Sequence, residues 1–175
     1  MKRRQYIYTY MTSAPGISGR RRMMKLGHGA NPKERMKDYT DKYTYRKESF
    51  SILFGFFKEK KETKPIKSSL CYWPLNVGPE KAKEIELKLA WFLHNELELE
   101  NHYLFVLRQQ LEGKLPDIYR TTKDGKLIWS GAKELHSLGA VNIDRLLPEK
   151  GPTARYKNAV KEIERILREN KWLAI

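Results

Sequence analysis

The sequence predicts an α+β fold with a basic extended N-terminal arm, a small antiparallel sheet or hairpins, and a mostly helical C-terminal half. Three observations support this class. Residues 1–48 show no helical periodicity, residues 50–73 contain two apolar and aromatic-rich pieces typical of strands, and residues 79–113 repeat apolar positions every three or four residues. A chain of 175 residues is long enough to bury a hydrophobic core.

The first 48 residues interleave basic residues with tyrosine and glycine. Residues 1–33 carry eight lysines or arginines and no acid, and Tyr6, Tyr8 and Tyr10 alternate as in a short strand. Such a segment buries little on its own, so we expect an extended arm that becomes ordered on its partner. Organellar transit peptides have a similar composition, which leaves a mitochondrial location open.

The remainder, residues 49–175, is predicted to form an α+β globular domain. Residues 50–57 and 66–73 favour strands and together suggest a hairpin. Residues 79–113 form the strongest helical stretch, as one long helix or two shorter ones. An unbroken helix would place Glu96 and Glu100 within its apolar stripe, so we expect a break between residues 95 and 101.

Residues 118–175 are predicted to contain a hairpin followed by helices. The Asp124-Gly125 pair indicates the hairpin turn, a helix is expected from Ser130 to Gly139, and a short helical turn and a last helix follow at residues 142–147 and 152–170. This order is similar to a helix-turn-helix unit, in which two supporting helices present the final one.

The net charge of +14 makes a polyanion the expected partner. Residues 1–77 hold 18 basic against 6 acidic residues, whereas residues 78–175 hold 17 against 15, so the surplus lies in the N-terminal half. Phosphate contacts are therefore predicted at a set of N-terminal basic residues: Arg3, Arg4, Arg20, Arg21, Arg22, Lys25 and Arg35. A basic stripe on the last helix is a second candidate, or a solvated face: Lys157, Lys161, Arg165 and Arg168.

The leading hypothesis is a non-catalytic protein that binds RNA or DNA, either as a component of a ribonucleoprotein or nucleoprotein particle or as a DNA-binding regulator or replication accessory that dimerises. An alternative is an interaction module for an acidic protein, with contacts at apolar positions such as Leu89. A third is a metal-dependent nuclease using Glu96, Glu98 and Glu100. No common catalytic motif or metal-binding spacing occurs, so no enzyme activity, cofactor or metal is expected.

Cys71 is the only cysteine, which excludes an intrachain disulfide framework and a cysteine-based zinc site. The longest apolar runs are too short to span a bilayer as a helix. We therefore expect no membrane contact and a reducing intracellular compartment, such as the cytoplasm or nucleoid.

Overall fold

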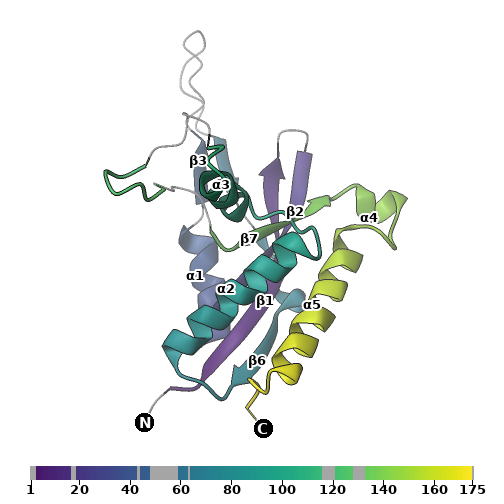
Figure 1. Cartoon of the computed structure of the whole chain (residues 1–175). Coiled ribbons are helices and arrows are strands. Elements are labelled where there is room, and N and C mark those ends of the chain that lie inside the picture. Colours follow the sequence, from purple (N-terminus) through teal and green to yellow (C-terminus); the bar gives the residue numbers. More distant parts are fainter. Residues whose placement is uncertain are drawn as a thin grey trace.

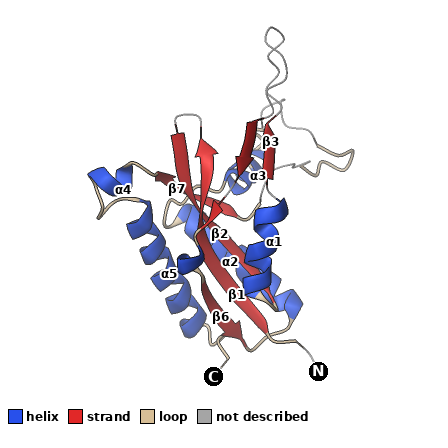
Figure 2. Ribbon diagram, turned by 180° about the vertical axis from the view of Figure 1, so that it is seen from behind, coloured by secondary structure: helices blue, strands red, loops and turns tan. Residues whose placement is uncertain are grey.

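The computed structural model describes residues 3–16, 19–42, 44–47, 59–62, 64–115, 121–127 and 133–174. Its centre is an antiparallel sheet with helices on both faces (Figures 1 and 2). The elements follow in the order β1 (Gln5–Gly16), β2 (Gly19–Gly29), α1 (Pro32–Lys42), β3 (Thr44–Lys47), β4 (Glu59–Glu62), β5 (Lys64–Pro65), a 3₁₀ turn (Lys67–Ser69), β6 (Cys71–Leu75), α2 (Pro79–Asn95), α3 (His102–Leu111), β7 (Leu135–Ala140), α4 (Ile143–Leu146) and α5 (Pro152–Glu169).

The long strands β1 and β2 form the middle of the main sheet. They pair antiparallel from Tyr6 opposite Gly29 to Gly16 opposite Gly19. The other edge of β1 is shared by β5 and β6, and the outer edge of β2 is covered by β7 only from Arg21 to Lys25. β3 and β4 form a separate two-stranded sheet. The C-terminal part of β2 therefore extends beyond its neighbour β7.

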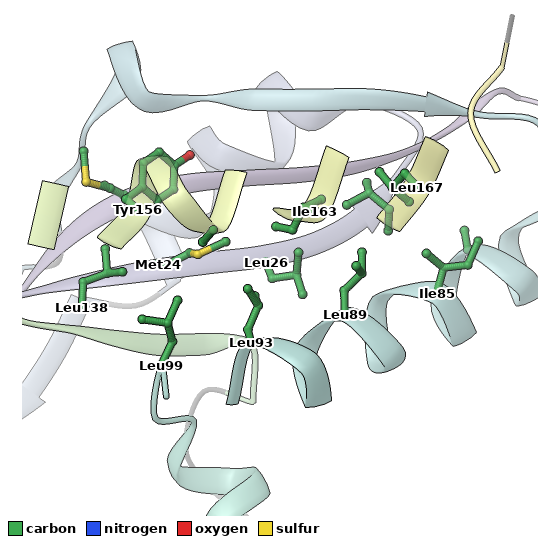
Figure 3. Close-up of a cluster of buried hydrophobic side chains, with 14 of the residues drawn as sticks. Met24, Leu26, Ile85, Leu89, Leu93, Leu99, Leu138, Tyr156, Ile163 and Leu167 are labelled. Atoms are coloured by element: carbon green, nitrogen blue, oxygen red, sulfur yellow. The ribbon is translucent and has the colours of Figure 1, made fainter. Parts of the chain in front are cut away.

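The main core lies between one face of the sheet and the helices α2 and α5. Met24 and Leu26 of β2 point toward this layer, as do the apolar side chains of both helices (Figure 3). Tyr8 and Tyr10 point to the opposite face, where Met36 of α1 packs against them. Helices thus cover both faces of the middle of β1 and β2, where residues 7–12 and 24–27 are buried. The largest fully buried side chains of the main core are Ile7, Met24, Leu26, Ile85, Leu89, Leu93, Leu99, Leu138, Ile163 and Leu167.

The α+β class is confirmed, and so is the predicted break between the two middle helices. α2 begins at Pro79 after Gly78 and ends at Asn95, and α3 begins after Asn101, whose side-chain oxygen accepts a hydrogen bond from the backbone N–H of Leu104 at 3.1 Å. The break keeps Glu96 and Glu100 exposed instead of within the apolar stripe. The predicted Asp124-Gly125 turn is present, with Thr121 bridged to Leu127.

The prediction of an extended N-terminal arm is wrong for residues 5–16 and 19–29, which form the two central strands. Tyr8 and Tyr10 are buried. The misreading has a physical cause, because strands covered on both faces lose the alternation of apolar and polar residues that marks a half-buried strand. Residues 32–42 are also not extended, since they form α1. The predicted basic contacts of this region therefore belong to folded elements: Arg20, Arg21, Arg22 and Lys25 to β2, and Arg35 to α1.

Two further predictions need correction. The strand predicted at residues 66–73 is β6, shifted to Cys71–Leu75, and it pairs with β1; its expected partner, residues 50–57, lies outside the described residues. The helix predicted from Ser130 to Gly139 is wrong, because Leu135–Ala140 is the strand β7. Within residues 118–175, the described part therefore contains β7, the short α4 and α5 instead of a helix-turn-helix-like arrangement.

The cause of the second error lies in Leu135 and Leu138, whose spacing of three residues fits a helix. In β7 these two side chains point to opposite faces of the sheet, Leu135 toward Tyr8 and Tyr10 and Leu138 into the main core. Pairing with β2 overrides the weak local preference for helix. Across the described part of the chain, no helix combines the length and apolar character needed to span a membrane.

Candidate functional site

A cleft of about 770 Å³ opens where the pairing of β7 with β2 stops. The last hydrogen bond between the two segments runs from the N–H of Leu26 to the carbonyl of Glu134, at 3.1 Å. Beyond it, the last residues of β2 border the cleft, and α1, α2 and α3 supply its walls. Because the edge of the sheet is open here, side chains from both faces of β2 reach the same space.

Tyr8 lies in this cleft and its position depends on Gly27. The two residues are paired across β1 and β2, and a β-carbon at Gly27 would lie 2.6 Å from Cζ and from the hydroxyl oxygen of Tyr8. The ring therefore occupies the space that any other side chain at position 27 would need. Burial, and secondly the negative charge of Glu86, raise the pKa of Tyr8. Tyr8 consequently stays a neutral phenol that can donate a hydrogen bond.

Lys25 is the buried cation of the cleft. It is opposite Tyr10, so it lies on the same face of the sheet as Tyr8, and only 6% of its surface is exposed. Its Nζ forms an ion pair with Glu134 at 2.9 Å. Burial lowers the pKa of Lys25, and the opposing effect of the Glu134 carboxylate is smaller. A lysine in this setting releases its proton more readily than one on the surface.

His28 and Glu86 form a pair on the other face of β2. Nδ1 of His28 contacts Oε2 of Glu86, which lies on α2. A carboxylate only accepts hydrogen bonds, so Nδ1 carries the proton, and in the neutral ring Nε2 is left as a proton acceptor. Arg35 of α1 also lines the cleft, and its charge acts on both Tyr8 and Lys25.

A buried polar network holds the wall of the cleft opposite α1. His136 is fully buried, and its Nδ1–H donates to the carbonyl of Leu99 at 3.0 Å. The side-chain amide of Asn101 donates to the carbonyl of Lys133 at 2.8 Å, and the backbone N–H of Asn101 donates to Nδ1 of His94 at 3.1 Å. Burial lowers the pKa of His136 to about 4. This network joins α2, α3 and β7, and His136 within it is neutral at pH 7.

The structure brings two of the predicted phosphate contacts, Lys25 and Arg35, into the cleft. The other N-terminal candidates lie elsewhere. Arg3, Arg4 and Arg21 are exposed, and Nε of Arg22 lies 3.6 Å from Oδ2 of Asp144. Arg20 belongs to β2, but its side chain lies outside the described ones.

The candidates on α5 divide into two kinds. Lys157 and Lys161 are exposed. Arg165 is bound by Glu162 and Glu169, and Arg168 by Glu164, all within the same helix. Such exposed pairs within a helix are typical of a solvated face and leave less charge for a phosphate backbone.

Sequence reasoning missed Tyr8, Gly27, His28, Glu86 and Glu134 as site residues. Only the fold joins them, because they come from β1, β2, α2 and the segment before β7. One local signal existed, namely the glycines on both sides of His28, which permit a close approach to the backbone. It is too common to identify a site without the fold.

The acidic site predicted for a nuclease is not assembled, since Glu96, Glu98 and Glu100 are all exposed. Within the ranges that the structure describes, no group of three or more histidine, cysteine, aspartate or glutamate side chains is arranged to hold a metal ion. Leu89, proposed as a protein contact, is buried in the core. Comparison of the chain with protein-family models, curated proteins and solved structures finds no match.

Proposed function

We propose that the protein acts on nucleic acid and that the cleft hydrolyses phosphodiester bonds. The observation that carries this proposal is the convergence of Tyr8, His28, Arg35 and Glu86 on one cleft in a chain of net charge +14. Titratable groups from distant parts of a sequence that meet in a cleft, with shifted pKa values among them, are typical of an active site. The third of the hypotheses from sequence, a nuclease, thereby gains support at a different set of residues.

The charge supports a polyanionic substrate. A surplus of this size attracts phosphate backbones at long range. At the cleft itself, exposed basic residues stand on three different segments: Arg35 on α1, Lys83 on α2 and Lys133 before β7. Four glutamates line the same cleft, Glu80, Glu84, Glu86 and Glu134, so the support for a polyanionic substrate comes from the net charge of the whole chain and not from a surplus at the cleft.

Each of the four groups has a role that its geometry allows. Arg35 can hold a phosphate through two parallel hydrogen bonds. His28, oriented by Glu86, can take a proton from the attacking water at Nε2. Tyr8, kept neutral by burial, can donate a hydrogen bond to the phosphate oxygen on which charge develops. Together they supply a base, a phosphate clamp and a donor.

Glu86 also allows a metal-assisted version of the same reaction. Mg²⁺ is often bound by one or two carboxylates together with substrate phosphates, so it needs no preformed cluster of three protein ligands. The cation would then polarise the phosphate and lower the pKa of the attacking water. In either version Glu86 is required.

The test is cleavage of labelled single- and double-stranded DNA and RNA by the full chain, with Mg²⁺ or with EDTA. We expect Glu86→Gln to reduce the rate about 100-fold or more, because it removes the group that orients the base or holds the cation. The matched control is Glu96→Gln, an exposed carboxylate at the end of α2. Loss of cleavage in EDTA would identify the metal-assisted version. Equal rates for the two variants would refute the assignment of the cleft.

Non-catalytic binding of nucleic acid is the second candidate, and the net charge favours it independently of the cleft. If no substrate is cleaved, fluorescence anisotropy across a salt series decides between the remaining hypotheses. A steep fall of log affinity with log salt would support a binding protein. An absence of binding at low salt would leave the acidic protein partner.

For the compartment, we propose a reducing one, in keeping with the lone thiol of Cys71.

A further inference from the structure

Lys25 has no part in the hydrolysis described above, yet it is the most buried cation of the cleft. It belongs to β2, opposite Tyr10 of β1 and Leu135 of β7, and its ammonium group lies 2.9 Å from the Glu134 carboxylate. Glu134 is itself partly exposed, so it can exchange a proton with a bound ligand or with water. Lys83 and Lys133 line the same cleft but are exposed. The cleft thus distinguishes one lysine from its neighbours by burial and by an adjacent carboxylate.

This setting suits a nucleophilic amine. Burial shifts Lys25 toward its uncharged form, in which the nitrogen lone pair can attack a carbonyl carbon. Intact nucleic acid offers no aldehyde. An abasic site does, because deoxyribose without its base opens to an aldehyde at C1′. It also lacks the base, which leaves room for the sugar to approach a recessed amine.

We propose that Lys25 forms a Schiff base with the C1′ aldehyde of abasic sites in DNA and cleaves the strand there by β-elimination. This second activity rests on the proposed function in one respect, namely that nucleic acid is the substrate of the cleft. It uses a different nucleophile, a different bond and no metal ion.

The reaction balances without an oxidant or a reductant. Glu134 takes a proton from the Lys25 ammonium group, and the freed lone pair of Nζ adds to C1′. The former carbonyl oxygen takes back this proton from Glu134 and a second one from Nζ and leaves as water, which gives a protonated imine and restores the Glu134 carboxylate. Glu134 takes a proton from C2′, and the electron pair of that C–H bond moves to form a C2′–C3′ double bond as the C3′–O bond breaks. The phosphate of the downstream strand departs with the electrons of that bond. Water then hydrolyses the imine, which releases an unsaturated aldehyde and restores Lys25.

The experiment mixes the full chain with an oligonucleotide that carries one abasic site, in EDTA, and adds sodium borohydride to reduce the imine to a stable bond. We expect a covalent adduct, and mass spectrometry of its digest should locate the nucleotide on Lys25. Lys25→Arg should abolish the adduct, whereas the matched control Lys88→Arg, at an exposed lysine of α2 outside the cleft, should retain it. No adduct with the unchanged protein, or an adduct located on another lysine, would overturn the proposal.

Two features of the experiment distinguish failure of this proposal from misfolding of a variant and from failure of the proposed hydrolysis. The location of the adduct in the unchanged protein does not depend on any variant, so misfolding of Lys25→Arg cannot decide the result. Glu86→Gln should lose cleavage of intact strands and still form the adduct. If intact strands are never cleaved but the adduct forms on Lys25, the hydrolysis fails and the Schiff base stands; the reverse result refutes the Schiff base alone.

Discussion

Acid should destabilise this protein through His136, and the size of the effect follows from its burial. The pKa of the ring falls from 6.5 to about 4 in the folded state. Each pKa unit corresponds to about 1.4 kcal/mol, so the difference amounts to about 3 kcal/mol of unfolding free energy. Above pH 6.5 the ring is neutral in both states. As the pH falls from 6.5 to 4, the unfolded chain takes up a proton that the folded chain refuses, and stability is lost.

The assay is urea unfolding of the unchanged protein and of His136→Gln at pH 7 and pH 4. Glutamine keeps an amide that can donate to the carbonyl of Leu99, but it does not titrate. We expect the unchanged protein to lose about 3 kcal/mol more than the variant over this interval. His102→Gln, at an exposed histidine, is the control and should keep the full loss.

Each protein is compared with itself at the two pH values, so the direct cost of the substitution cancels, because that cost is present at both. His94, whose pKa burial also lowers, contributes in the same direction and remains in both proteins. If His136→Gln and the unchanged protein lose equal stability between pH 7 and pH 4, the reasoning about burial of a neutral ring is refuted.

Three further substitutions test the packing around the site and the core. Gly27→Ala should displace Tyr8, cost about 1–3 kcal/mol and reduce cleft activity, while Gly78→Ala, which meets no atom within 4 Å, should not; thermal unfolding and the cleavage assay measure both. Tyr156→Phe removes a 2.6 Å hydrogen bond to the carbonyl of Ser69 and should cost about 1–3 kcal/mol in urea unfolding. Leu89→Ala should cost about 2–5 kcal/mol, whereas Leu87→Ala, 51% exposed on the same helix, should stay within about 0.5 kcal/mol.

The helices that sequence predicted correctly are those whose ends carry local signals. Gly78-Pro79 and Gly151-Pro152 place a proline at the first helical position of α2 and of α5. The break after α2 followed from the cost of burying a carboxylate without a partner. These effects act over a few residues, so they can be read without the fold.

The long strands, in contrast, could not be identified from local signals. β1 and β2 belong to a segment that composition alone assigns to a solvated arm, because arginines and tyrosines dominate it. What makes them strands is the cover that α1, α2 and α5 provide, and those helices come later in the chain. The helix predicted from the spacing of Leu135 and Leu138 is wrong for the same reason, since only pairing with β2 decides which face each side chain occupies.

Only the basic residues of the site could be predicted from the sequence. Lys25 and Arg35 were among the predicted contacts because they are basic, not because anything local marks them as neighbours. The pairing of His28 with Glu86 joins residues 58 positions apart, and that of Lys25 with Glu134 joins residues farther apart still. Such pairs depend on the register of β2 with β1 and β7, which no local pattern specifies.

Under the proposed function, the surface and the cleft would have different roles toward a polyanion. Exposed basic residues such as Lys157 and Lys161 act at long range and are screened by salt. Inside the cleft, Lys25 and His28 are each held by a carboxylate. In the proposed reactions, a substrate at Lys25 competes with Glu134 for the ammonium group, whereas Glu86 keeps His28 oriented. Under the proposed function, the surface would attract nucleic acid in general, and the paired charges of the cleft would restrict which part of it reacts.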